Sequence, residues 1–102
     1  MATQIYSKTS TQTAIQVNSV DLLYINSTGA ITPATTGTQD FGSATLRWNN
    51  IYTSDLNLSN GIGDYTIVEG EEDLFLYNNK SGKTFKFALI EVDPATAPKK
   101  AL

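Results

Sequence analysis

Short strand-like runs separated by turn residues recur along this chain, and they constrain its fold more than any other feature. Residues 14–18 alternate between apolar and polar side chains, the period of two that a half-buried strand shows. Such runs return roughly every 8 to 12 residues, a spacing typical of all-β folds. No segment has sustained helical periodicity. We therefore predict an all-β fold made of short antiparallel strands.

The C-terminal third has the clearest strand pattern. Asn60-Gly61 is a strong tight-turn signal. Residues 84–92 form the longest predicted strand, in which Phe85, Phe87 and Leu89 share one face. This pattern predicts a small antiparallel sheet with one buried face. The complete set of predicted strands covers 14–18, 22–25, 30–32, 51–52, 56–58, 65–68, 74–77 and 84–92.

Composition agrees with extended structure and divides the 102 residues into three regions. Polarity comes mainly from 14 Thr, 8 Ser and 8 Asn, residue types common in strands and turns. We predict an extended arm or shaft with short strands over 1–40 and a compact β domain, a sandwich or barrel-like, over 41–93. A flexible Pro/Ala/Lys tail follows over 94–102. For residues 1–13 two interpretations stay open, a frayed terminus or a docking segment that becomes ordered on a partner.

The absence of His and Cys excludes most catalytic chemistry. It removes the commonest general base and the thiolate nucleophile, and no Ser lies in a Gly-x-Ser-x-Gly elbow. Gly61-Ile62-Gly63 is followed by no helical pattern, so it is not read as a phosphate-binding loop. We predict no catalytic residue and no cofactor, and therefore not an enzyme.

Charge disfavours several partners. The net charge is −3 and, apart from Lys99-Lys100, the basic residues are scattered, so nucleic-acid binding is not expected. No apolar run approaches the roughly 20 residues that span a bilayer, and Met1–Tyr6 does not resemble a signal peptide. An acidic group could gather oxygen ligands around Ca²⁺, but it lacks the Asp-x-Asp-x-Asp-Gly spacing and is read as a solvated loop, without a metal site. Its members are Asp64, Glu69, Glu71, Glu72 and Asp73.

The only Arg and the only Trp stand side by side at Arg47-Trp48, after the turn-prone Gly42-Ser43. Arg can stack on an aromatic face or bond a carboxylate or carbonyl, and Trp can anchor a core or a subunit contact. These packing interpretations are favoured. The alternative is a carbohydrate-binding platform joined by other aromatic residues, with Tyr65 and Tyr77 facing the ligand and Tyr52 as a further candidate.

The module Asp40–Tyr52, which reads Asp-Phe-Gly-Ser-x-x-x-Arg-Trp-x-x-Ile-Tyr, resembles a segment common in bacteriophage tail-fibre and related virion proteins. The neighbouring segments 15–18, 25–31 and 53–61 also look like such proteins. Residues 65–93 are similar to the ends of small structural proteins of marine and cyanobacterial phages. The resemblance therefore extends over most of the chain.

This resemblance implies a virion structural protein and an intertwined homotrimer, assembled in the host cytoplasm. Tail fibres are usually much longer than 102 residues, so we expect a short fibre on tail or capsid, attached to other virion proteins through the N-terminal arm. Three copies would also cover apolar residues that a thin first half cannot bury alone. A host-surface glycan is the alternative partner. The residues expected in packing or at the subunit interface are Ile15, Val17, Leu22, Tyr24, Trp48, Ile51, Tyr52, Phe85 and Phe87.

Overall fold

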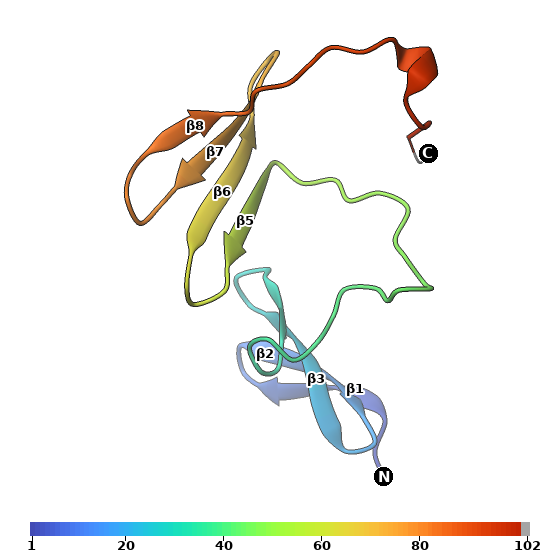
Figure 1. The fold of residues 1–102 in the computed structure, drawn as a ribbon. Helices are drawn as coiled ribbons and strands as arrows, with labels where there is room; N and C mark the ends of the chain where they lie inside the picture. Colours follow the sequence, from blue (N-terminus) through green and yellow to red (C-terminus); the bar gives the residue numbers. More distant parts are fainter. Residues whose placement is uncertain (101–102) are drawn as a thin grey trace. The chain divides into compact units, whose positions relative to one another are not determined.

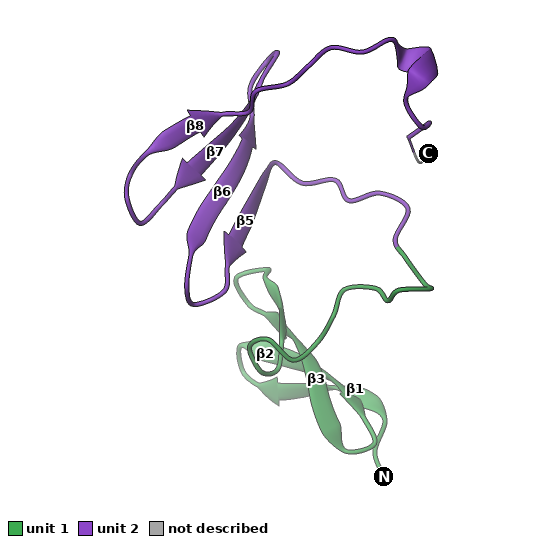
Figure 2. Ribbon diagram, viewed as in Figure 1, with its two compact units in different colours: residues 1–47 green, residues 48–102 purple. Residues whose placement is uncertain are grey.

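A computed structural model describes residues 1–100, and these residues form two antiparallel four-stranded sheets with one 3₁₀ turn (Figure 1). The chain divides into two compact units, residues 1–47 and 48–102 (Figure 2), and each unit contains one sheet. The all-β prediction is confirmed. The elements are β1 (Gln4–Thr9), β2 (Gln12–Val17), β3 (Val20–Asn26), β4 (Ile31–Pro33), β5 (Asp55–Ser59), β6 (Asp64–Glu69), β7 (Leu74–Asn78), β8 (Thr84–Lys86) and η1 (Pro94–Thr96).

Sheet A is a meander with strand order β1-β2-β3-β4. Its central hairpin turns at Asn18 and Ser19, which both have positive φ, 51° and 64°. Two central residues with positive φ are the mark of a type I′ turn, whose twist matches that of the flanking strands. The β3–β4 connection uses Gly29 at φ 91°, a conformation that costs glycine little. Local turn chemistry therefore sets the order of the strands.

A β-bulge in β3 decides which residues share each face of sheet A. Ile15 pairs with Leu23, but the next residue, Gln16, pairs with Asp21, so Leu22 is the extra residue. The shift places Asp21 on the same face as Ala14 and its cross-strand neighbours. Those neighbours are Tyr6 and Tyr24, which pair with Ala14 from either side. Ala14, at 0% exposure, is the one hydrophobic residue of the described chain that is fully buried.

The other face of sheet A is apolar and has no covering layer within its unit. The ladder places Ile5, Ile15 and Leu23 in one cross-strand row, and Ile25 opposite Ile31 in the next. Ile5 is 71% exposed and Ile31 69%. We call this surface the apolar face of sheet A; its members are Ile5, Ile15, Val17, Val20, Leu23, Ile25, Ile31 and Pro33.

Sheet B, with strand order β5-β6-β7-β8, has one apolar face and one more polar face, although Val68, Phe75 and Tyr77 also lie on the latter. On its polar face the Thr66 hydroxyl donates to Asn57 Oδ1 at 2.7 Å and accepts from Asn79 Nδ2 at 2.9 Å. The opposite surface, here called the apolar face of sheet B, is half exposed at its edges, with Leu56 at 48% and Phe85 at 50%. Its members are Leu56, Leu58, Tyr65, Ile67, Leu74, Leu76 and Phe85.

One observed strand was not predicted and two predicted strands are wrong, each because pairing depends on distant residues. β1 was not among the predicted strands, and it forms because Ile5 and Tyr6 pair with Ile15 and Ala14 of β2. Residues 51–52 are not a strand, because β6, which pairs with β5, ends where Gly70 starts a turn. The strand over 84–92 stops at Lys86, because β7 begins at Leu74 and offers no further partner.

Neither sheet is closed into a barrel, so the barrel-like form predicted for 41–93 is also wrong. The strand order is linear in both sheets, and β5 and β8 are not paired with each other. Closure would need a pairing between the first and last strands. Each unit is thus a single open layer within the residues that the structure describes.

We expect Ala14→Leu to destabilise the protein by about 1–3 kcal/mol, the usual cost of overpacking a filled site. Ala14 is fully buried between Tyr6 and Tyr24, so a larger side chain must displace a ring. Urea denaturation followed by circular dichroism measures the change. Thr13→Leu, one residue earlier and on the other face, is the control and should cost little. Equal effects of the two substitutions would contradict this packing.

Candidate functional site

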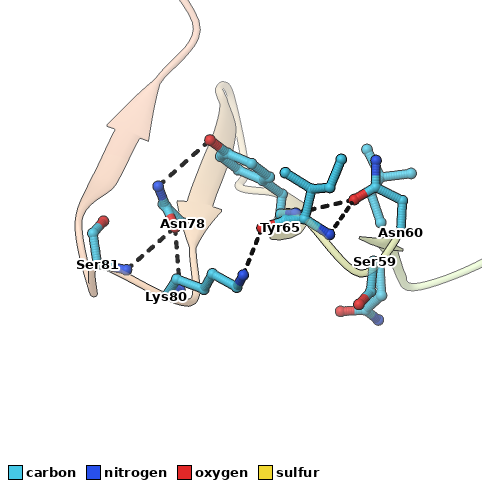
Figure 3. Close-up of a pocket in the computed structure, with 10 residues that line it drawn as sticks. Ser59, Asn60, Tyr65, Asn78, Lys80 and Ser81 are labelled. Atoms are coloured by element: carbon cyan, nitrogen blue, oxygen red, sulfur yellow. Dashed lines mark hydrogen bonds between the residues drawn. The ribbon is translucent and has the colours of Figure 1, made fainter.

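A groove of about 890 Å³ lies at one end of sheet B, between the β5–β6 turn and the β7–β8 turn (Figure 3). It lies wholly within the second unit. Its lining residues are Asn57, Leu58, Ser59, Asn60, Ile62, Gly63, Tyr65, Asn78, Lys80 and Ser81.

Two asparagines hold the turns on either side of the groove. Asn60 Oδ1 accepts from the backbone amides of Ile62 at 2.9 Å and Gly63 at 3.0 Å. Asn78 Oδ1 accepts in the same way from Lys80 at 3.1 Å and Ser81 at 3.3 Å. Asn side chains commonly replace a missing backbone partner at such turns. Both walls of the groove are therefore fixed by their own sequence.

Tyr65 lies between the two turns (Figure 3). Its hydroxyl accepts from Asn78 Nδ2 at 3.5 Å, and Lys80 Nζ donates to the Ile62 carbonyl at 2.5 Å, which ties one turn to the other. A Cβ added at Gly63 would lie 3.1 Å from the Tyr65 ring, so glycine makes room for the ring there. The groove thus joins one aromatic ring to apolar walls from Leu58 and Ile62.

The lining combines apolar side chains with polar groups that can bond a ligand. The polar groups are amides, hydroxyls and one ammonium, and no carboxylate or imidazole is among the lining residues. Such a surface can stack on a ring and bond hydroxyl groups, but it offers no general base or metal ligand set.

The tyrosines considered as a sugar platform do not meet on one surface. Tyr65 pairs with Asn78 and Thr66 pairs with Tyr77, so Tyr65 and Tyr77 point to opposite faces of sheet B. Tyr52 lies in the segment before β5 and is 94% exposed. Only Tyr65 contributes to the groove.

Arg47-Trp48 stands at the boundary between the two units. The loop before it is closed by Leu46, whose backbone amide donates to Ser43 Oγ at 2.9 Å and whose carbonyl accepts from the Ser43 amide at 2.9 Å. Arg47 Nη1 donates to the Ala44 carbonyl at 2.7 Å, the backbone bond that was one of its predicted roles. Trp48 is 61% exposed and Ile51 70%, so the chain itself covers neither fully.

The remaining predicted packing residues are spread over both units. Ile15 and Val17 lie on the apolar face of sheet A, whereas Tyr24 lies on the opposite face and Leu22 in the bulge. Phe85 lies in β8 of sheet B and Phe87 directly after it, and they are 50% and 37% exposed. Most of these side chains therefore keep apolar surface that their own unit does not cover.

Asp21, which binds four side chains, was not among the functional residues predicted from the sequence. Its carboxylate accepts from the Tyr6 hydroxyl at 2.7 Å, Lys8 Nζ at 2.8 Å, Gln16 Nε2 at 3.2 Å and the Tyr24 hydroxyl at 3.2 Å. Lys8 also lies 5.4 Å from the centre of the Tyr24 ring. Sequence reasoning placed Asp21 only at a strand end, because a bulge that shifts its face has no local signal.

The hydrogen bonds of this cluster shift the pKa values of Asp21, Lys8 and Tyr6. The hydrogen bond from Lys8 first, and then that from Tyr6, lowers the pKa of the Asp21 carboxyl. Asp21 in turn raises the pKa of Lys8 and of Tyr6 through the same bonds. The cluster carries positive and negative charge together, with its donors and acceptors satisfied by one another, and we read it as structural.

The comparisons with known proteins give no family. No family model matches the chain, and no significant similarity to a curated protein or a solved structure was found. In residues 1–100, no set of three or more His, Cys, Asp or Glu side chains is placed to hold a metal ion. No helix in that range is long and apolar enough to cross a membrane.

We expect unfolding of the protein to depend on pH through Asp21. Because its pKa is lowered below 3.8 in the folded state, its stabilising contribution is present above that value and is lost as pH falls further. The raised pKa values of Tyr6 and Lys8 add a second loss as pH rises above about 10.

Melting temperatures measured from pH 2 to 11 test this profile. Asp21→Asn should flatten the acid side of the curve, since its amide does not titrate. Asp40→Asn, in an exposed loop, is the matched control and should keep the acid slope of the wild type. An Asp21→Asn curve parallel to that of the wild type would contradict the role of the cluster.

Proposed function

We propose that this protein is a structural component of a phage virion, a short fibre-like homotrimer attached to the tail or the capsid. The observation that carries the proposal is that each unit exposes one apolar sheet face with no second layer over it. The resemblance of Asp40–Tyr52 to fibre segments supports the virion setting and the number of copies.

A single sheet layer of this size is marginal by itself. Folded proteins bury sheet faces against a second layer, and small units need oligomerisation or other support when their own core is insufficient. Here Ile5 stays 71% exposed and Ile31 69% in sheet A, and Leu58 49% and Phe85 50% in sheet B. Burial of a Leu or Ile side chain contributes about 1.5–3 kcal/mol, so association of copies through these faces would supply the missing stability.

The apolar surface is spread along the chain, as a fibre subunit needs. One apolar face belongs to each unit, and the connecting segment adds Leu46, Trp48, Ile51 and Tyr52. Contacts between copies through both units would stabilise a fibre-like assembly more than contacts through a single local patch would. In the trimer, the predicted packing residues act as subunit contacts.

Light scattering on the purified protein tests the oligomer, with an expected mass of about three times 11.1 kDa. A stable monomer at micromolar concentration would overturn it. Immunogold electron microscopy of the phage particles that carry this gene tests the virion role. Label at tail or capsid is the expected result, and particles without label would contradict it.

We expect Leu56→Asp to dissociate the trimer and Asn57→Asp to leave it intact. The two residues are neighbours in β5 and lie on opposite faces, Leu56 on the apolar one and Asn57 on the polar one. A charge buried at a subunit contact is costly, whereas a charge on the solvated face is not. Sedimentation velocity at matched concentrations measures the effect. A Leu56→Asp trimer as stable as that of the wild type would show that this face is not the contact.

A second candidate function, glycan binding at the virion surface, is favoured by the groove around Tyr65. One ring, amides and hydroxyls, with the Lys80 ammonium bonded to the Ile62 carbonyl, suit a saccharide. We expect Tyr65→Ala to weaken a glycan-array signal at least tenfold, equivalent to about 1.4 kcal/mol. Tyr77→Ala, on the opposite face, is the control and should keep the signal. An array with no wild-type signal would remove this candidate.

A further inference from the structure

Residues 87–92 have the sequence of a strand but no strand beside them in their own unit. The segment reads Phe-Ala-Leu-Ile-Glu-Val, and the Phe87 amide still donates to the Leu74 carbonyl at 2.9 Å. Leu74 is the first residue of β7, so β7 offers nothing further. Figure 1 shows the chain leaving the sheet after β8. Leu89 and Ile90 are 66% and 89% exposed.

The segment cannot pair with β8, from which it continues. A strand that folds back needs turn residues, and the first after β8 is Asp93-Pro94. Residues 87–90 are an apolar run, and Glu91 and Val92 follow it, a composition that favours a strand. Residues 87–92 therefore need an edge that lies elsewhere.

The open edge of β5 is the complementary feature. Proteins protect edge strands with Lys or Pro, and three of the four sheet edges here carry one. β1 has Lys8, β4 has Pro33 and β8 has Lys86. β5 has neither, its one charged residue is Asp55 at its first position, and its five residues are one fewer than the six of 87–92. Among the described edges, β5 is the least protected against addition of a strand.

The strand order indicates that the strand added to the β5 edge comes from a second copy of the chain. β5 and β8 lie at opposite edges of sheet B, three interstrand spacings or about 14 Å apart. A chain therefore releases residues 87–92 at one edge and presents its acceptor at the other. Such a donor and acceptor are heterologous, and contacts of this kind close into a ring when the rotation allows.

We propose that residues 87–92 of one copy add as a fifth strand to β5 of the next, so that each copy donates one strand and accepts one. This proposal rests on the self-association in the proposed function and gives it a mechanism. Three copies in a ring would leave neither the donor nor the β5 edge uncovered. The added strand would also lengthen sheet B at the side where Leu56 is half exposed.

The chain has no Cys, so engineered cysteines report the contact directly. Asn57→Cys is co-expressed with Leu89→Cys, and separately with Ile90→Cys. Cross-strand neighbours bring Cβ atoms close enough for a disulfide. Leu89 and Ile90 are successive residues, so they point to opposite faces of the added strand. We therefore expect more disulfide-linked chains with one of these two cysteine variants than with the other. Asn57→Cys with Lys83→Cys, in the β7–β8 loop, is the control and should stay uncrosslinked.

Ile90→Pro removes an amide donor from the exchanged strand and should reduce the trimer to monomer. Residue 90 pairs with no strand of its own chain, so the circular dichroism of the sheets should be unchanged. Lys99→Pro, beyond η1, is the matched control and should remain trimeric.

The outcomes separate this inference from the proposed function. A wild-type trimer with no crosslink in either mixture, or with Ile90→Pro still trimeric, overturns the strand exchange and leaves self-association standing. A wild-type monomer overturns both. Crosslinked trimers that are absent from virions overturn the virion role alone.

Discussion

Each of the two sheets has one apolar face and only one layer, and the rest of the molecule depends on this constraint. A sheet is stable when its apolar face is covered, and within residues 1–100 the only element besides the two sheets is the single 3₁₀ turn Pro94–Thr96. Turns, bulge and polar clusters define the strands, but they do not provide a core. Local interactions therefore define the strands and their pairing. The burial that stabilises the sheets must come from contacts that cover their apolar faces.

The faces opposite the apolar ones show how much polar contacts can do. In sheet A, Asp21 gathers two tyrosine hydroxyls, an ammonium and an amide above the buried Ala14. In sheet B, Asn57, Thr66 and Asn79 form a shorter chain of hydrogen bonds. Such bonds contribute about 0.5–1.5 kcal/mol each, enough to fix register but less than a full apolar layer supplies. Each sheet is thus well defined on one side and incomplete on the other.

Sequence reasoning succeeded where structure is set by neighbours. The strands at 65–68 and 74–77 and the turn at Asn60-Gly61 follow from alternation and turn chemistry, and they are present. It failed where pairing joins distant residues, as in β1, or where a bulge moves Asp21 to another face. The groove around Tyr65 was also beyond sequence, because it depends on two turns that meet only after β5, β6 and β7 align.

The exchanged strand and the groove would be compatible in one assembly. Strand addition would cover the edge of Asp55–Ser59, which also gives three lining residues to the groove, while Tyr65 and the two turns lie on other parts of sheet B. A ring of three copies would then present three grooves on one particle. Linked sites bind a multivalent surface far more tightly than one site does, provided that the geometry lets them engage together. A shallow groove of modest affinity would therefore be sufficient for adhesion once the sheets have completed one another.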